Sequence, residues 1–364
     1  MSETTAGSDT DAYAVRPFEP ADRDPYLELY GEVFGTRPGK AWFDWKYAEN
    51  PYADGVPVVV AERDGRLVGA RSFLALALRT PDGRVDAFQA CDTMVHPDHR
   101  RRGLFTRMTR DALARYAGGP ALSFNFPNER TLAGNRKLGW QLVENLGVYH
   151  RFQDPSQHLG AVPSALRRPL AAGASGLLRL GERLRAPDAP GVAVERHAEV
   201  PVALLAELSR TGQPAAFHVP RDERFYGWRY ARPDRRYDTY VARRDGVPVG
   251  ATVVGAGDGG VARFMEFLPR TGRGDAVSAA LVRAALATRH DVPLVSTLVD
   301  DVDPALLAAF GFLGSETPLV GSMLGTRPFV VRPFGAEPTG WCIDGADVRD
   351  PDNWLLGYGE IDVA

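Results

Sequence analysis

A basic turn between an apolar strand and a helix is the segment of this sequence best suited to bind an anion. A mostly apolar run from Ala87 to Val95 ends at Pro97, basic residues occupy 99–102, and a helical pattern begins after Gly103. Backbone N–H groups and the positive end of a helix dipole at such a turn bind phosphate groups. Gly103 allows close approach of a ligand because it has no Cβ. The pattern predicts a pyrophosphate site, with a solvated basic turn as the alternative.

The segment that follows the turn supports the ligand-binding interpretation. A helix expected over Leu104–Ala117 ends at Gly118-Gly119-Pro120, and a second apolar strand is expected over Ala121–Phe126. A further helical pattern begins at Asn128 and closes at Gly139-Trp140. The order is strand, basic turn, helix, strand, helix.

These segments together resemble the GNAT acetyltransferase superfamily. The acyl-CoA motif of that family, Arg/Gln-x-x-Gly-x-Gly/Ala, matches Arg100–Phe105. Its later motif has Asn, then Tyr seven residues on, then Gly-Phe, and matches Asn128, Asn135 and Gly139-Trp140. The resemblance implies an α/β fold with a mixed sheet, and acetyl-CoA or another acyl-CoA as co-substrate.

The resemblance also implies which residues contact the acyl-CoA. Pantetheine amides would pair with the strand, and the pyrophosphate would meet the start of the helix. The expected cofactor-binding residues are Met94, Val95, Arg100, Arg101, Arg102, Gly103, Leu104, Phe105, Thr106, Asn128, Thr131 and Asn135. Two of them depart from the family pattern. Phe105 replaces a small residue, and Asn135 replaces the Tyr that in many members protonates the departing thiolate.

Asp92 is the expected catalytic residue, as a base for the acceptor amine. It lies on the strand before the turn, in a region where family members often place an acid. A structural carboxylate held by hydrogen bonds is the alternative for Asp92. His96 is expected to face solvent. No metal is expected, because the His residues are scattered and Cys91 and Cys342 are not paired with them.

The sequence repeats itself, which predicts two copies of one unit. Trp45-Lys46-Tyr47-Ala48 is matched by Trp228-Arg229-Tyr230-Ala231, and each is followed by an Arg-Asp-Gly hairpin turn. The counterpart of the basic turn, Pro269–Gly274, is one residue shorter and precedes Asp275, whose charge disfavours a phosphate. Each copy is expected to run β-α-α-β-β-β-α-β-α-β, with the nucleotide site in the first copy alone.

The expected division has five parts. They are a disordered tail (1–12), a first GNAT domain (13–153), a linker with an amphipathic helix (154–194), a degenerate second domain (195–325) and a C-terminal extension packed on the domains (326–364). Strands of the first copy are expected at Ala14–Arg16, Val58–Arg63, Leu67–Leu78, Val85–Val95, Ala121–Phe126 and Gln141–Phe152.

Composition limits the partners. A net charge of −3 argues against nucleic acid, and no apolar run of membrane-spanning length occurs. With two cysteines and no signal peptide, a cytoplasmic location is expected. The predicted function is an acyl-CoA-dependent N-acyltransferase acting on a small-molecule or peptide amine in a ternary complex. The alternative is a non-catalytic CoA-binding or ligand-sensing protein. A third interpretation, transfer from aminoacyl-tRNA, is disfavoured by the intact basic turn.

Overall fold

The computed structural model describes residues 12–153, 176, 185–212, 215–256, 260–289, 292–298, 302–315, 317, 327–335 and 337–362. The chain divides into two units. Unit 1 comprises Met1–Val143 with Phe329–Pro351, and unit 2 comprises Glu144–Pro328 with Asp352–Ala364. Nearly all of the expected tail, and most of the expected linker with its amphipathic helix, lie outside the described residues.

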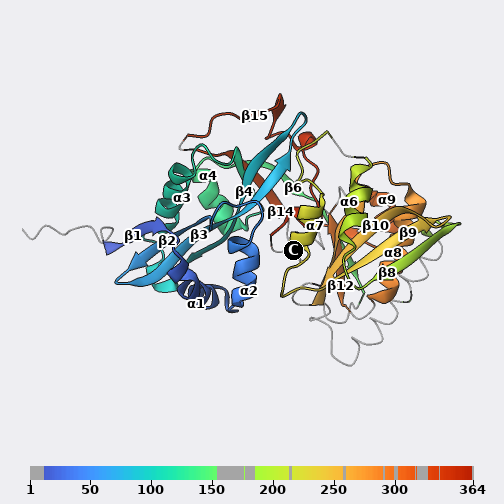
Figure 1. The fold of residues 1–364 in the computed structure, drawn as a ribbon, viewed down its shortest axis with the longest axis horizontal. Coiled ribbons are helices and arrows are strands. Elements are labelled where there is room, and N and C mark those ends of the chain that lie inside the picture. Colours follow the sequence, from blue (N-terminus) through green and yellow to red (C-terminus); the bar gives the residue numbers. More distant parts are fainter. Residues whose placement is uncertain are drawn as a thin grey trace, which may run out of the picture. The chain divides into compact units, whose positions relative to one another are not determined.

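A mixed sheet forms the centre of unit 1. Its strands are β1 (Ala14–Pro17), β2 (Val58–Arg63), β3 (Arg66–Arg79), β4 (Arg84–Val95), β5 (Leu122–Asn125), β6 (Gln141–Leu146) and β14 (Arg327–Pro333). Within the described residues the order is β1-β2-β3-β4-β5-β14-β6, with β4 and β5 parallel and β14 antiparallel to β5 (Figure 1). A small separate hairpin joins β15 (Cys342–Ile343) to β16 (Ala346–Asp347).

Helices cover both faces of this sheet. They are α1 (Arg23–Phe34), α2 (Lys40–Phe43), a π-helical turn (Asp44–Ala48), α3 (Leu104–Arg115) and α4 (Glu129–Lys137). Ser72 of β3 is hydrogen-bonded to Tyr26 of α1, whereas its neighbour Phe73 packs in one core cluster with Leu104 and Met108 of α3. Because successive side chains of a strand point to opposite faces, α1 and α3 lie on opposite sides of the sheet.

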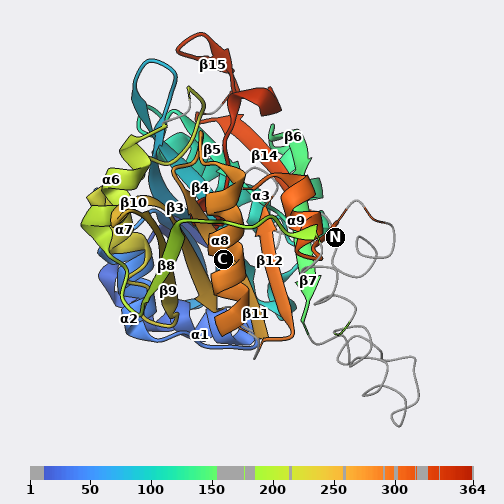
Figure 2. The same ribbon diagram turned by 90° about the vertical axis from the view of Figure 1, so that its right-hand side faces the viewer.

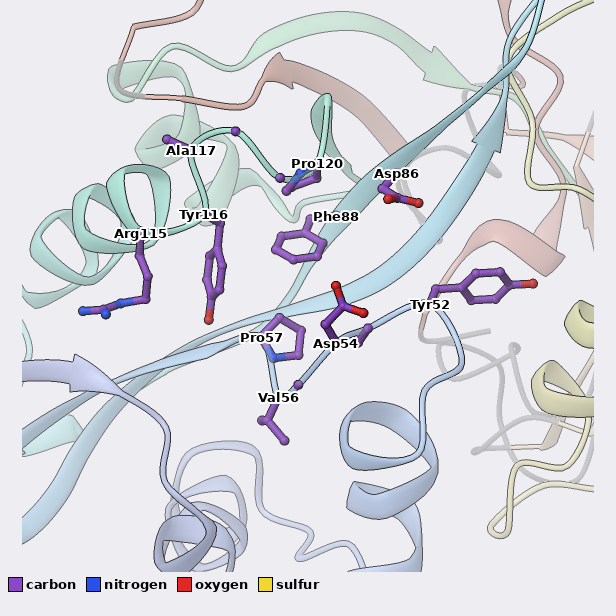
Figure 3. A pocket seen from close by; sticks show the side chains of 14 residues that line it. Tyr52, Asp54, Val56, Pro57, Asp86, Phe88, Arg115, Tyr116, Ala117 and Pro120 are labelled. Atoms are coloured by element: carbon purple, nitrogen blue, oxygen red, sulfur yellow. The ribbon is translucent and has the colours of Figure 1, made fainter.

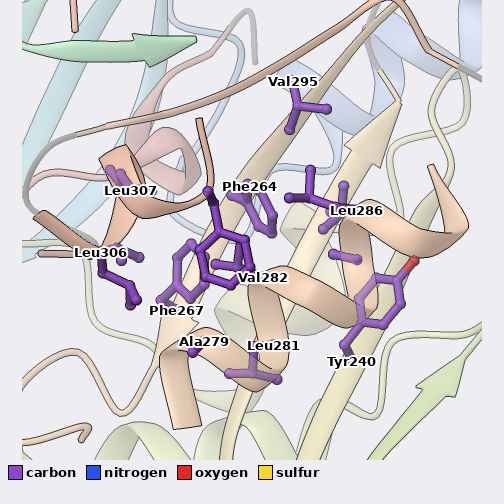
Figure 4. Close-up of a cluster of buried hydrophobic side chains, with 14 of the residues drawn as sticks. Tyr240, Phe264, Phe267, Ala279, Leu281, Val282, Leu286, Val295, Leu306 and Leu307 are labelled. Atoms are coloured by element: carbon purple, nitrogen blue, oxygen red, sulfur yellow. The ribbon is translucent and has the colours of Figure 1, made fainter. Parts of the chain in front are cut away.

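Unit 2 repeats this arrangement. Its strands are β7 (Val148–Phe152), β8 (Val192–His197), β9 (Tyr237–Arg244), β10 (Val247–Ala256), β11 (Val261–Leu268), β12 (Leu294–Leu298) and β13 (Leu313–Gly314), and its helices are α6 (Val202–Arg210), α7 (Glu223–Arg229), α8 (Asp275–Thr288) and α9 (Pro304–Ala309). The strand order in the described part is β13-β7-β12-β11-β10-β9-β8 (Figure 2). One cluster of buried apolar side chains contains Leu281 and Val282 of α8, Phe264 and Phe267 of β11 and Leu307 of α9 (Figure 4).

The predicted element order is present in both units. The first runs β1-α1-α2-β2-β3-β4-α3-β5-α4-β6 and the second β8-α6-α7-β9-β10-β11-α8-β12-α9-β13. The expected fold class, an α/β fold with mixed sheets in two tandem units, is confirmed.

The prediction of one strand over Gln141–Phe152 is wrong. The strand breaks at Gly147, so that β6 belongs to the first sheet while β7 pairs antiparallel with β12 in the second. The place beside β5 is taken by β14, from the expected C-terminal extension. Phe329–Pro351, which the sequence places in the C-terminal extension, belongs to unit 1 together with Met1–Val143. Apolar alternation marks a buried strand but does not specify its partner, and glycine weakens a strand interior.

Candidate functional site

A cavity of about 560 Å³ opens beside the turn that joins β4 to α3. It combines the basic turn, the first turn of α3 and the first turns of α4. Its lining residues are Val33, Phe34, Thr93, Val95, His99, Arg100, Arg101, Gly103, Leu104, Phe105, Asn128, Arg130, Thr131 and Gly134. The two sequence motifs, which begin at Arg100 and at Asn128, thus meet in one place.

The backbone of the turn is shaped to present N–H groups. Arg101 and Gly103 both have left-handed backbone angles, with φ of 64° and 73°. Gly103 is the N-cap of α3, and no side chain caps the start of that helix. Left-handed residues close together in a turn, followed by an uncapped helix start, direct main-chain N–H groups towards an anion. The backbone of this turn therefore has the geometry that suits an anion.

The pairing of β4 with β5 provides the second feature of the site. The two strands are paired at Ala87–Leu122, Phe88–Ser123 and Gln89–Phe124. Beyond Gln89, β4 continues to Val95 while its described pairing with β5 has ended. Within the described residues, no strand pairs with the β5-side edge of β4 beyond Gln89. Arg100 folds back on the end of this strand and donates from Nε to the carbonyl oxygen of Val95 at 3.1 Å.

Eight of the expected cofactor-binding residues line the cavity. They are Val95, Arg100, Arg101, Gly103, Leu104, Phe105, Asn128 and Thr131. Arg102, Thr106, Met94 and Asn135 do not line it. The side chains of Met94 and Asn135 are fully buried, and Asn135 donates from Nδ2 to Oδ1 of Asn125 at 3.3 Å. The side chain of Asn135, on α4, is thus part of the protein interior.

The bulky Phe105 is accommodated by a glycine on the facing helix. A Cβ placed on Gly134 would lie 2.9 Å from Cε1 of Phe105, closer than real contacts allow. Gly134 therefore makes room for the ring that replaces the small residue of the family motif.

Asp92 lies in a buried polar network on the α1 side of the sheet. It sits at a β-bulge of β4, where the register with β3 shifts, and has a φ of 40°. Its Oδ2 accepts hydrogen bonds from Nζ of Lys46 at 2.6 Å and from the hydroxyl of Tyr47 at 2.5 Å. The side chains of Lys46 and Asp92 are 2% and 6% exposed. Burial and then the charge of Asp92 raise the pKa of Tyr47 well above its ordinary value, so Tyr47 remains a hydrogen-bond donor.

His96 is less exposed than the sequence suggested. Its side chain is 16% exposed, with Nε2 lying 3.7 Å from Oε2 of Glu32. Its Nδ1 accepts a hydrogen bond from the backbone N–H of Asp98.

Arg71 is a residue beside the cavity that the sequence interpretation missed. It is fully buried on β3, opposite the bulge of β4, and donates from Nη1 to Oγ1 of Thr93 at 2.5 Å. The available signal was its charge, because Arg71 is the one charged residue in the apolar run from Leu67 to Leu78.

A second cavity, of about 510 Å³, lies at the opposite end of β4. Figure 3 shows the rings of Phe88 and Tyr116 near Pro57 and Asp54, and Asp86 at its margin. Asp86 precedes Val95 by nine residues of the same strand, which corresponds to about 30 Å. This cavity is therefore separate from the basic turn.

The side chains of the corresponding turn in unit 2 are hydrogen-bonded or ion-paired within that unit. Arg273 donates from Nη1 to the carbonyl oxygen of Pro269 and from Nε to Oγ of Ser278. Oγ1 of Thr271 donates to the carbonyl oxygen of Gly212. Arg270 is ion-paired with Glu360 at 3.1 Å. Side chains that extend from this turn are thus engaged within unit 2.

The network around Asp92 also has a counterpart in unit 2. Tyr230, which matches Tyr47 in the repeat, donates to Oε1 of Glu266 on β11 at 3.0 Å. Glu266 is ion-paired with Arg221, which also binds Glu360 of the 3-10 turn Tyr358–Glu360. A tyrosine-to-carboxylate bond at this strand therefore occurs in both units, including the one in which the side chains of the basic turn are bound within the unit.

No group of three or more His, Cys, Asp or Glu side chains among the described residues is arranged to hold a metal ion. No helix in the described part of the chain is long and apolar enough to cross a membrane.

Comparison with known proteins agrees with the resemblance seen in the motifs. Residues 14–143 match the sequence profile described as "Acetyltransferase (GNAT) domain". No protein of curated function has a matching sequence.

Solved structures extend the comparison to the whole chain. The fold is similar to that of a probable N-acyltransferase from Enterococcus faecalis, with a TM-score of 0.62 and 12% identity over 90% of this chain and 74% of that one. A GCN5-related N-acetyltransferase from Anabaena variabilis gives a TM-score of 0.59 and 12% identity over 89% and 73%. A tandem GNAT protein from the clavulanic acid biosynthesis pathway gives 0.55 and 19% over 90% and 100%. Residues 14–143 therefore match the profile of the GNAT acetyltransferase domain, and the chain has a fold similar to that of tandem GNAT proteins.

Proposed function

We propose that this protein is an acyl-CoA-dependent N-acyltransferase whose acyl-CoA site is the cavity beside the β4–α3 turn. One observation carries the proposal: the uncapped start of α3, two arginines of the basic turn and the first turn of α4 all line this cavity. Main-chain N–H groups of 104–106, with Arg100 and Arg101, would bind the pyrophosphate. The edge of β4 near Met94 and Val95 would pair with the pantetheine amides.

The acceptor in this proposal is a small-molecule or peptide amine that attacks the thioester directly. A new C–N bond forms as the C–S bond breaks, the amine loses a proton, and CoA leaves as a thiolate that takes up a proton. Holding both reactants in one complex supplies much of the rate enhancement in such reactions. Asn135 would not protonate the thiolate, because its carboxamide is not an acid at neutral pH and its side chain is buried.

For Asp92 we favour the structural alternative over the catalytic base. Its Oδ2 is bound by Lys46 and Tyr47. A matching tyrosine-to-carboxylate bond is present in unit 2, where the side chains of the corresponding turn are bound within the unit, which supports a role in fixing the strand.

A turnover assay tests the proposal against the non-catalytic alternative. The protein is incubated with acetyl-CoA and, separately, polyamines, aminoglycosides and peptide amines, and the released CoA thiol is measured. Thiol release that depends on one class of amine is the expected result. CoA binding without turnover on any acceptor would support the ligand-sensing alternative, and absence of CoA binding would contradict both.

A further inference from the structure

The guanidinium of Arg71 is a buried charge that the proposed reaction does not use. Among the described residues, its Nε and Nη2 have no hydrogen-bond partner, and Nη1 is bound to Thr93. The rings of Phe73, Phe105 and Trp140 lie 5.2, 5.3 and 5.7 Å from its central carbon. Ring faces stabilise a cation in part, but a buried cation without an anion is costly.

Arg71 remains charged at neutral pH. Burial lowers its pKa to about 10, which is still well above neutrality. An anionic group that reached this guanidinium would therefore meet a full positive charge in surroundings of low polarity, where electrostatic attraction is strong.

The two unpaired nitrogens form the edge of the guanidinium that fits a carboxylate. The N–H of Nε and one N–H of Nη2 are parallel, and together they bind the two oxygens of a carboxylate. In this chain Arg115 holds Asp111, and Arg232 holds Asp234, through the same two nitrogens. A thiolate presents a single acceptor atom and matches this edge less well.

The position of Arg71 connects this edge with the acyl-CoA cavity. Thr93, which accepts its hydrogen bond, and Phe105, which stacks on it, both line that cavity. The cavity thus has groups suited to phosphate at the start of α3, and the buried guanidinium of Arg71 contacts two of its lining residues.

We propose that the acyl group carried by CoA ends in a carboxylate, as in a succinyl thioester, and that Arg71 binds this carboxylate through Nε and Nη2. The inference rests on the proposed function, because it assigns a substrate class to the same cavity. The bonds made and broken stay the same: the amine nitrogen bonds to the thioester carbon, the C–S bond breaks, and CoA takes up the proton released by the amine. The product is an amide that keeps a free carboxylate.

Calorimetric titration with succinyl-CoA and butyryl-CoA tests the substrate class. The two acyl chains have the same number of carbons and differ in a terminal carboxylate against a terminal methyl group. The wild-type protein is expected to bind succinyl-CoA at least tenfold more tightly, and Arg71→Met is expected to abolish this preference. Equal wild-type affinities would overturn the inference and leave the proposed function intact. If neither thioester nor free CoA binds, the proposed function fails as well.

Arg332 provides a matched control. Its guanidinium is also buried on Trp140, at 5.4 Å, but it donates to the carbonyl oxygens of Leu138, Pro333 and Gly335. Without ligand, Arg332→Met should lower the melting temperature, whereas Arg71→Met should lower it less or raise it, because an uncompensated charge is removed. Arg332→Met should retain the preference for succinyl-CoA. An Arg71→Met protein that is destabilised like Arg332→Met and keeps the preference would show that Arg71 is a structural residue.

Discussion

Lys46 and Asp92 form an ion pair that is almost inaccessible to water, and this pair determines what a substitution at Asp92 does. Asp92→Asn leaves the buried charge of Lys46 without its counter-ion. The free energy of unfolding is expected to fall by about 3–5 kcal/mol, as measured by urea denaturation. The double variant Lys46→Met/Asp92→Asn removes both charges and should recover most of this loss.

Two outcomes would contradict the structural role of Asp92. One is a loss of about 0.5 kcal/mol or less in Asp92→Asn, as is usual for surface substitutions. The other is a double variant that is fully stable, binds CoA as the wild type does and has no transfer activity, which would assign Asp92 to catalysis.

Phe105 and Gly134 are expected to be energetically coupled, because their atoms leave no space for a further methyl group. Alanine is favoured over glycine inside a helix by up to about 1 kcal/mol. In the wild type, Gly134→Ala should nevertheless be destabilising, since its Cβ would lie 2.9 Å from the Phe105 ring. In a Phe105→Ala background the same substitution should be neutral or stabilising. Thermal unfolding of the four proteins measures the coupling, and additive effects would disprove the contact.

At the scale of secondary-structure elements, most strands of unit 1 could be predicted from the sequence. The five strands expected before Asn128 are present with ends shifted by no more than one residue. Their partners were harder to infer. The alternation of apolar and polar residues in Gln141–Phe152 and in β14 indicates buried strands. It does not indicate that β7 belongs to the second sheet or that β14 belongs to the first.

The site was predictable to the extent that it is local in sequence. The basic turn and the start of α4 lie within two short motifs, and both line the cavity. Arg71 and the Lys46–Asp92 pair depend on how β3, β4 and the π-helical turn meet. Such contacts follow from tertiary packing, for which neither the motifs nor periodicity gives a rule.

The C-terminal 3-10 turn Tyr358–Glu360 makes unit 2 sensitive to acid. Burial alone would raise the pKa of Glu360, but the charges of Arg221 and Arg270 outweigh it and lower the pKa from 4.5 to about 2. A carboxyl group with a lower pKa in the folded state stabilises the fold above its unfolded pKa, and this contribution is lost as the pH falls through the folded value. A shift of this size corresponds to about 3 kcal/mol.

Urea denaturation as a function of pH tests this effect. The free energy of unfolding of the wild type should decline between pH 4.5 and pH 2, the interval set by the two pKa values. Glu360→Gln should be less stable near neutrality and should show a smaller decline. Glu207→Gln, at an exposed position of α6, serves as the control and should follow the wild type. Parallel curves for wild type and Glu360→Gln would contradict the assignment.

At the scale of the whole molecule, two units with the same element order differ in the turn that follows their fourth strand. In unit 1 the turn borders a cavity and leads into an uncapped helix. In unit 2 its side chains are engaged with one another and with the C-terminal segment. We therefore expect one CoA site per chain, in unit 1.

Calorimetric titration of free CoA into three charge-reversal variants tests this claim most directly. Arg101→Glu places a negative charge in the cavity and should weaken binding at least tenfold, or about 1.4 kcal/mol. Arg110→Glu, exposed on the same helix, and Arg273→Glu, in the turn of unit 2, should bind CoA as the wild type does, with one CoA per chain. Equal losses in Arg101→Glu and Arg273→Glu, or unchanged binding in Arg101→Glu, would contradict the placement of the site.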